Sequence, residues 1–177
     1  MKNALILSTG LILLPFSAQA AAPAEMHTCM LLTANEVSAA IGGRAGSSQE
    51  DNIVIPNGPA KGDIMGMCMW RAGAGGMVSV NMVHALQSAQ REAGFAKLEE
   101  NFAKLKAQGW TQETKVIGDA KCLSMKPPTG RDNVPGMTGC MVEAKGMALS
   151  VGAMSSGNQV AMEPIKELLD KAVARLQ

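Results

Sequence analysis

Two hydrophobic periodicities alternate along the chain and predict its secondary structure. Apolar residues recur every three or four positions in three segments, which predicts helices from Thr33 to the Gly42–Gly43 pair, over Ser88–Gln108 and over Gln159–Leu176. Strand-like runs predict six strands, at Met65–Arg71, Met77–His84, Thr111–Ile117, Lys121–Lys126, Thr138–Lys145 and Met147–Met154. This order predicts an α+β fold with a largely antiparallel sheet and helices packed on one face.

Local signals mark where these elements begin and end. Thr33 and Glu36 have the T-x-x-E spacing of a capping box, so we expect the first helix to begin there. Pro164 suits the first turn of the last helix. Residues 43–63 are rich in Gly, Ser, Asn and Pro, which predicts a loop with one short strand around Ile53–Ile55.

Two stretches of the sequence echo each other. Cys68 and Cys140 each begin a five-residue run that starts Cys-Met and ends in Ala, and a Gly-Met pair follows each run. A domain built from two similar halves is therefore one possible form of the fold. The length of 177 residues agrees with a single domain in either case.

The N-terminus has the pattern of a secretory signal. Lys2 is followed by an apolar stretch that ends in Ser17-Ala18-Gln19-Ala20, an A-x-A type of cleavage sequence. We therefore expect residues 1–20 to be a cleavable signal peptide and residues 21–177 to form one exported domain. Because no cysteine lies at the cleavage point, a lipid anchor is not expected, and we predict a periplasmic protein. The alternative is an N-terminal membrane anchor.

Composition narrows the classes of partner. The chain has 16 basic and 15 acidic residues, and removal of Lys2 with the signal makes the two numbers equal. A neutral domain lacks the basic surface with which proteins bind nucleic-acid phosphates. Aromatic residues make up 3% and Tyr is absent, so a base-stacking surface is not expected. No later apolar run is long enough to predict a membrane span.

All four cysteines, Cys29, Cys68, Cys122 and Cys140, follow the predicted signal. An even number in an oxidising compartment predicts two disulfides. Of the three pairings, we favour Cys29–Cys68 with Cys122–Cys140, because each bond then ties neighbouring elements. A cysteine metal site is the alternative, but the sequence has no C-x-x-C spacing.

A longer pattern combines several of these features. It reads Cys29-x-Leu31-Leu32-Thr33-x-x-Glu36-Val37, then Cys68-x-Trp70, then Gly118-Asp119-Ala120 and Lys145-Gly146. The pattern resembles small exported proteins and lipoproteins of unknown function, best known from actinobacteria. The resemblance implies an α+β extracellular domain, of a kind likened to sensor domains, with no established chemistry. The chain differs from the lipoprotein members because it lacks a lipidated cysteine and contains 14 methionines.

The sequence offers no support for an active site, so we expect a protein that is not an enzyme. Its two histidines, His27 and His84, have no local carboxylate support of the kind that orients a catalytic imidazole. Four paired cysteines would leave no thiol nucleophile. The glycines of residues 58–62 do not have the spacing of a phosphate-binding loop.

Methionine is the most distinctive residue type of the predicted strands. Side chains alternate between the two faces of a strand, so residues of equal parity share a face. If Cys68 bonds Cys29, then Cys68 and Trp70 face the helices, and the opposite face carries Met65, Met67, Met69, Met77 and Met141. Because exposed apolar patches mark binding surfaces, we predict a sensor-like face that binds a protein, a peptide or a small apolar ligand without a cofactor.

Three alternatives to this interpretation stay open. Thioethers are soft ligands that select Cu(I), so Met67, Met69 and His84 are candidates for a Cu(I) or Ag(I) site. The methionine face could instead be ordinary packing, covered by residues 43–63 or by a second subunit. The protein could also inhibit an enzyme of the cell envelope.

Overall fold

The computed structural model describes residues 26–58, 61–84, 100–131, 134–156 and 159–176. The predicted signal peptide, residues 1–20, lies outside the described residues. Residues 85–99, which include the first part of the predicted helix Ser88–Gln108, lie outside them too. Within the described ranges, none of the helices has the length and apolar character needed to cross a membrane.

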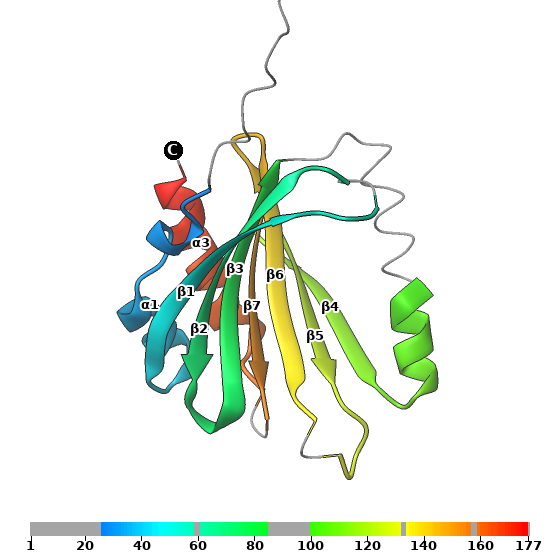
Figure 1. Cartoon of the computed structure of the whole chain (residues 1–177). Coiled ribbons are helices and arrows are strands. Elements are labelled where there is room, and N and C mark those ends of the chain that lie inside the picture. Colours follow the sequence, from blue (N-terminus) through cyan, green and yellow to red (C-terminus); the bar gives the residue numbers. More distant parts are fainter. Residues whose placement is uncertain (1–25, 59–60, 85–99, 132–133, 157–158, 177) are drawn as a thin grey trace, which may run out of the picture.

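The described chain forms a seven-stranded sheet in the order β1-β2-β3-β7-β6-β5-β4 (Figure 1). All six neighbouring pairs are antiparallel. The strands are β1 Ala45–Val54, β2 Ile64–Ala72, β3 Gly76–His84, β4 Thr111–Ile117, β5 Ala120–Lys126, β6 Gly136–Ala144 and β7 Met147–Ser155. The helical elements are η1 Thr28–Met30, α1 Ala34–Ile41, η2 Gly73–Gly75, residues 100–107 and α3 Met162–Arg175. The predicted α+β class is therefore confirmed.

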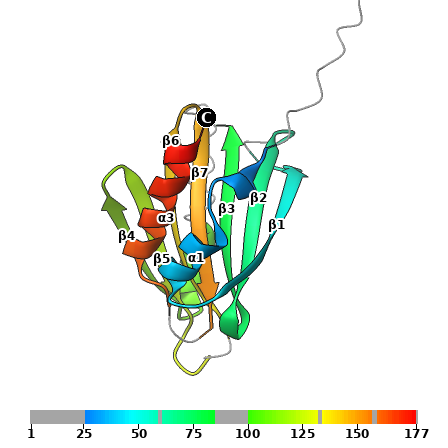
Figure 2. The same ribbon diagram turned by 90° about the vertical axis from the view of Figure 1, so that its left-hand side faces the viewer.

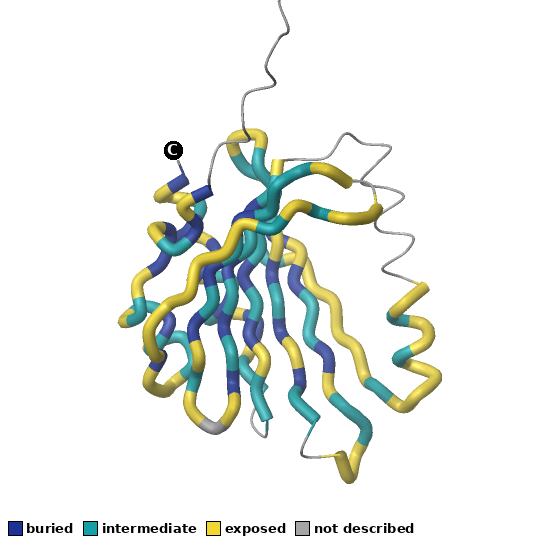
Figure 3. The backbone as a smooth tube through the Cα atoms, in the orientation of Figure 1, coloured by how far each residue is buried: buried dark blue, intermediate teal, exposed yellow. Residues whose placement is uncertain are grey.

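Helices α1 and α3 cover one face of the sheet, called the covered face below (Figure 2). Trp70 and Val80 from the sheet and Ile165 and Leu169 from α3 are at most 1% exposed and form the centre of the core. Buried positions alternate with more exposed ones along β2, β3 and β6, as Figure 3 shows. This period of two means that one side of each strand faces the helices.

The capping box and the proline predicted at the helix starts are both present in the structure. The Thr33 side chain accepts a hydrogen bond from the Glu36 amide, and the Glu36 carboxylate accepts one from the Thr33 amide at 2.9 Å, which completes the capping box. Helix α3 begins at Met162, later than the predicted Gln159, with Pro164 in its first turn. The Gln159 side chain instead donates hydrogen bonds to carbonyls of β5 and β6, which ties this residue to the sheet.

Both predicted disulfides are confirmed. Cys29 beside β2 bonds Cys68 with a Cα–Cα distance of 4.9 Å, and Cys122 bonds Cys140 with a distance of 4.0 Å. The first bond holds the N-terminal segment against the covered face. The second joins residues that lie directly opposite each other on β5 and β6.

The prediction of a loop over residues 43–63 is wrong for most of its first half. Residues Ala45–Val54 form β1, which pairs with β2 along its length. Nearly all of β1 is exposed, and it is an edge strand with one neighbouring strand. Its polar composition reflects that position, while its backbone hydrogen bonds to β2 hold it in the sheet. This segment therefore extends the sheet and does not cover the methionine face.

Candidate functional site

The face of the sheet opposite α1 and α3, called the open face below, is where the candidate site lies. In Figure 1 the helix of residues 100–107 stands beside β4, with the sheet between it and helices α1 and α3. The pairing register aligns the open-face side chains in rows across the strands. One row runs Met69, Ser79, Gly152, Gly139 and Leu123, and the next runs Met67, Asn81, Ser150, Met141 and Lys121.

The structure places the five predicted methionines on the open face, on three strands. Met65, Met67 and Met69 follow each other along β2, Met77 lies on β3 and Met141 on β6. Met141 is 38% exposed and the other four are partly buried. Methionine is thus exposed on this face, but the residues are spread over it and do not form one compact group.

His84 is not brought together with Met67 and Met69. It ends β3 at a position whose side chain alternates away from the open face, and its Nδ1 lies 3.7 Å from a carboxylate oxygen of Asp63. In the described part of the chain, no three or more His, Cys, Asp and Glu side chains are grouped so that they could hold a metal ion.

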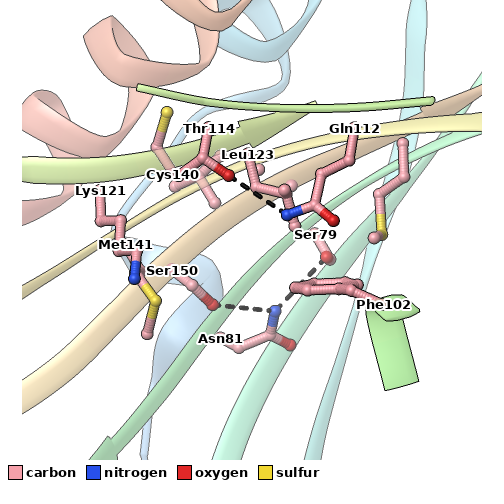
Figure 4. A pocket seen from close by; sticks show the side chains of 14 residues that line it. Ser79, Asn81, Phe102, Gln112, Thr114, Lys121, Leu123, Cys140, Met141 and Ser150 are labelled. Carbon is pink, nitrogen blue, oxygen red and sulfur yellow. Dashed lines mark hydrogen bonds between the residues drawn. The ribbon is translucent and has the colours of Figure 1, made fainter. Parts of the chain in front are cut away.

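The open face is hollowed into a pocket of about 520 Å³ between the sheet and the helix of residues 100–107 (Figure 4). This volume lies in the range of pockets that hold small molecules. The lining residues come from β3, β4, β5, β6, β7 and that helix: Ser79, Asn81, Phe102, Gln112, Thr114, Lys121, Leu123, Met137, Gly139, Cys140, Met141, Ser150, Val151 and Gly152.

Two glycines form the floor of the pocket. Gly139 on β6 lies directly opposite Gly152 on β7. Neither has a positive φ. A Cβ atom added to Gly139 would have its nearest neighbour at 3.5 Å, and one added to Gly152 at 3.7 Å. The backbone therefore does not require glycine at either position, and the missing side chains are what leaves the space above the sheet open.

Polar side chains stand on two sides of this floor. Asn81 on β3 donates long hydrogen bonds to the hydroxyls of Ser79, at 3.5 Å, and Ser150, at 3.4 Å. Gln112 donates to the Thr114 hydroxyl on β4 at 3.3 Å (Figure 4). These long contacts are weak, so the same groups can exchange them for hydrogen bonds to a ligand.

Apolar side chains complete the pocket. Leu123, Met137 and Met141 stand on β5 and β6, and Phe102 reaches in from the helix of residues 100–107 (Figure 4). An apolar lining with a few polar groups is typical of a site that binds an organic molecule through burial and orients it through hydrogen bonds.

The described lining of the pocket carries little charge. Among the described lining residues, none is Asp, Glu or His, and Lys121 is the one charged residue. Cys140 takes part in a disulfide and has no thiol. The polar groups that the described lining offers to a ligand are therefore the Lys121 ammonium, side-chain amides and the hydroxyls of Ser79, Thr114 and Ser150.

The group whose pKa is displaced most lies far from the pocket, between α1 and α3. Arg175 donates hydrogen bonds of 2.7 Å to both carboxylate oxygens of Glu36, and the Thr33 cap adds more donors. These bonds outweigh partial burial and lower the pKa of Glu36 to about 2. Since Glu36 forms part of a helix cap, its displaced pKa reflects a structural link and not a catalytic group.

Most of the pocket was not predicted from the sequence. The parity of the strands indicated Met141, but not the polar residues Ser79, Asn81 and Ser150 or the two floor glycines. One signal was available: Gly139 and Gly152 each interrupt an alternating strand pattern, which indicates a bulge or a close approach of another group.

Comparisons with known proteins give a likeness in fold. No protein family model matches the sequence, and no curated protein matches it significantly. The structure is similar to the extracellular domain of PknH from Mycobacterium tuberculosis, with a TM-score of 0.53 and 11% sequence identity. The similarity covers 84% of this chain and 93% of that domain. It agrees with the α+β fold that the sequence resemblance implied.

Proposed function

We propose that this protein is a non-enzymatic binding protein of the periplasm. Its ligand is a small molecule with an apolar body and one uncharged or anionic hydrogen-bonding group, held in the pocket on the open face. The observation that carries this proposal is the hollow above the Gly139–Gly152 pair, since the strand backbone does not need glycine there. A sensor-like role is supported by the likeness in fold to an extracellular domain.

The lining of the pocket favours a small molecule over a protein or peptide partner. A protein surface would meet a hollow where the two glycines lie, whereas a small molecule would fill it. Leu123, Met137 and Phe102 would contact the apolar body, and Asn81 with Ser150 would hydrogen-bond the polar group. A cationic group would find no carboxylate among the described lining residues. The two disulfides support a location in an oxidising compartment outside the cytoplasm.

The test is a titration with N-phenyl-1-naphthylamine, an uncharged apolar fluorophore, followed by its displacement with dodecanoic acid. Gly152→Leu would place a side chain inside the pocket, and we expect it to weaken probe binding at least about 10-fold. Ala148→Leu adds a similar side chain to the same face of β7 outside the pocket lining, so it is the matched control and should bind as the wild type does.

A second variant tests the polar side of the pocket. Asn81→Leu removes the amide but keeps an apolar side chain. We expect dodecanoic acid to lose about 2- to 10-fold in affinity, as for the loss of one hydrogen bond, while the uncharged probe changes little. Equal probe binding by wild type and Gly152→Leu would contradict the proposed pocket. Failure of the probe and the acid to bind the wild type at all would also contradict it.

A further inference from the structure

A row of methionines crosses the open face next to the pocket. The pairing register aligns Met77 on β3 with Met154 on β7, Met154 with Met137 on β6, and Met137 with Met125 on β5. Directly opposite residues of antiparallel strands have Cβ atoms about 4.5–5.5 Å apart. Four thioethers therefore lie side by side on four consecutive strands, although they are far apart in the sequence.

Three of these side chains are accessible. Met154 is 36% exposed, Met137 is 37% exposed and Met77 is partly buried, whereas Met125 is 3% exposed. Methionine has three rotatable side-chain bonds, so neighbouring sulfur atoms can turn toward a shared ligand at little cost. Met154 is the central residue, with one accessible thioether on each side.

We infer that Met77, Met137 and Met154 form a site for a soft monovalent cation, Cu(I) or its analogue Ag(I). Thioether sulfur is a soft ligand and selects Cu(I) over the harder divalent ions. Both disulfides hold their cysteines, so no free thiol in the chain competes for the ion. The site does not depend on the proposed ligand pocket, whose lining shares only Met137 with it.

The same register explains why Met67 and Met69 are weaker candidates. They are two positions apart along one strand, and their partners on β3 are Asn81 and Ser79, not methionines. The positive charge of Arg71 also affects where along the row a cation would lie. Arg71 continues the methionine row on β2, opposite Met77, so its guanidinium would repel a cation at that end. The ion is therefore held mainly between Met154 and Met137.

The test uses the disulfide-intact protein labelled with [methyl-¹³C]methionine, titrated with Ag(I) in a buffer that contains no chloride. We expect one equivalent of Ag(I) to shift the methyl signals of Met77, Met137 and Met154, which single Met→Leu variants assign. In the triple variant Met77→Leu/Met137→Leu/Met154→Leu, the affinity for Ag(I) should fall at least about 100-fold, because even indirect partners of a metal contribute 10- to 100-fold. Leucine nearly conserves the volume, so the fold should be kept.

A second triple variant is the matched control. Met65→Leu/Met67→Leu/Met69→Leu removes three thioethers from the same face on β2 and should bind Ag(I) as the wild type does. Absence of Ag(I) binding by the wild type would overturn the inference. Equal loss in both triple variants, or no loss in the first, would overturn it too. Binding of N-phenyl-1-naphthylamine, measured in parallel, reports the apolar pocket separately, so either proposal can fail alone.

Discussion

Glycine has opposite roles on the two faces of the sheet. Gly66 of β2 lies on the covered face, where an added Cβ would come within 2.3 Å of the Thr28 hydroxyl and 2.6 Å of the Met26 Cβ. On the open face, an added Cβ at Gly139 or Gly152 would meet only ordinary contacts. The first glycine is required by close packing of the N-terminal segment. The other two are required by nothing within the described fold.

This difference separates stability from binding. The covered face holds the buried core, one end of the disulfide that fixes the N-terminal segment, and the helix layer. The open face holds exposed methionines, weak polar contacts and a hollow. Substitutions on the covered face should therefore lower the free energy of unfolding strongly, whereas substitutions on the open face should change binding and have smaller effects on stability, of either sign.

The largest expected effect comes from neighbouring residues of β2 that face opposite sides. Trp70 is 1% exposed on the covered face, so Trp70→Ala should lower the free energy of unfolding by about 3–5 kcal/mol. Met69 is partly buried on the open face, and Met69→Ala should cost about 1 kcal/mol. Urea unfolding followed by circular dichroism measures both. Similar losses in the two variants would mean that the open face is packed as tightly as the covered one.

Gly66→Ala should have the next largest effect. Thr28 is fully buried and Met26 is 7% exposed, so neither can move away freely from the new methyl group. Such overpacking costs about 1–3 kcal/mol, which urea unfolding would measure. The added methyl group should push the N-terminal segment away from β2 and make the segment around Cys29 more accessible. The Cys29–Cys68 bond should therefore be reduced faster by dithiothreitol. An unchanged midpoint would show that the N-terminal segment is not fixed against β2.

A smaller effect should follow from breaking the link between α1 and α3. The pKa of Glu36 is lowered to about 2 from an ordinary value of 4.5, so the carboxylate stabilises the fold above pH 4.5 and loses this effect as the pH falls toward 2. Because Arg175 is 40% exposed, water screens the pair, and Glu36→Gln should cost about 1 kcal/mol at pH 7. The two proteins should converge in stability near pH 2. A constant difference across this range would contradict the role of the charge.

Much of the covered face could be predicted from the sequence, because its signals are local. The capping box at Thr33, the cysteine pairs and the parity of Cys68 and Trp70 each involve a short segment or a chemically exclusive partner. The edge strand Ala45–Val54 could not be predicted, because it gains its structure from hydrogen bonds to β2 and not from an apolar pattern of its own.

The pocket and the methionine row could be predicted only in part. Parity shows which face a residue occupies, but the residues beside it on the next strand depend on the register between strands. Met154 and Met137 become neighbours, and Gly139 meets Gly152, only through the β6–β7 pairing. Phe102 reaches the pocket from a different element, the helix of residues 100–107, whose position beside the sheet no local pattern specifies.

The smallest expected effect on stability has the opposite sign. Alanine is favoured over glycine within a strand by about 0.5–1 kcal/mol, and neither Gly139 nor Gly152 has a positive φ or a close neighbour that forbids a methyl group. Gly139→Ala and Gly152→Ala should therefore each raise the free energy of unfolding, while the double variant binds N-phenyl-1-naphthylamine less tightly than the wild type. A gain in stability together with weaker probe binding would show that the missing side chains serve the space above the sheet and not the fold. A gain in stability with undiminished probe binding would separate the glycine pair from the binding site. A loss of stability would show that the glycines serve the fold, as Gly66 does on the covered face.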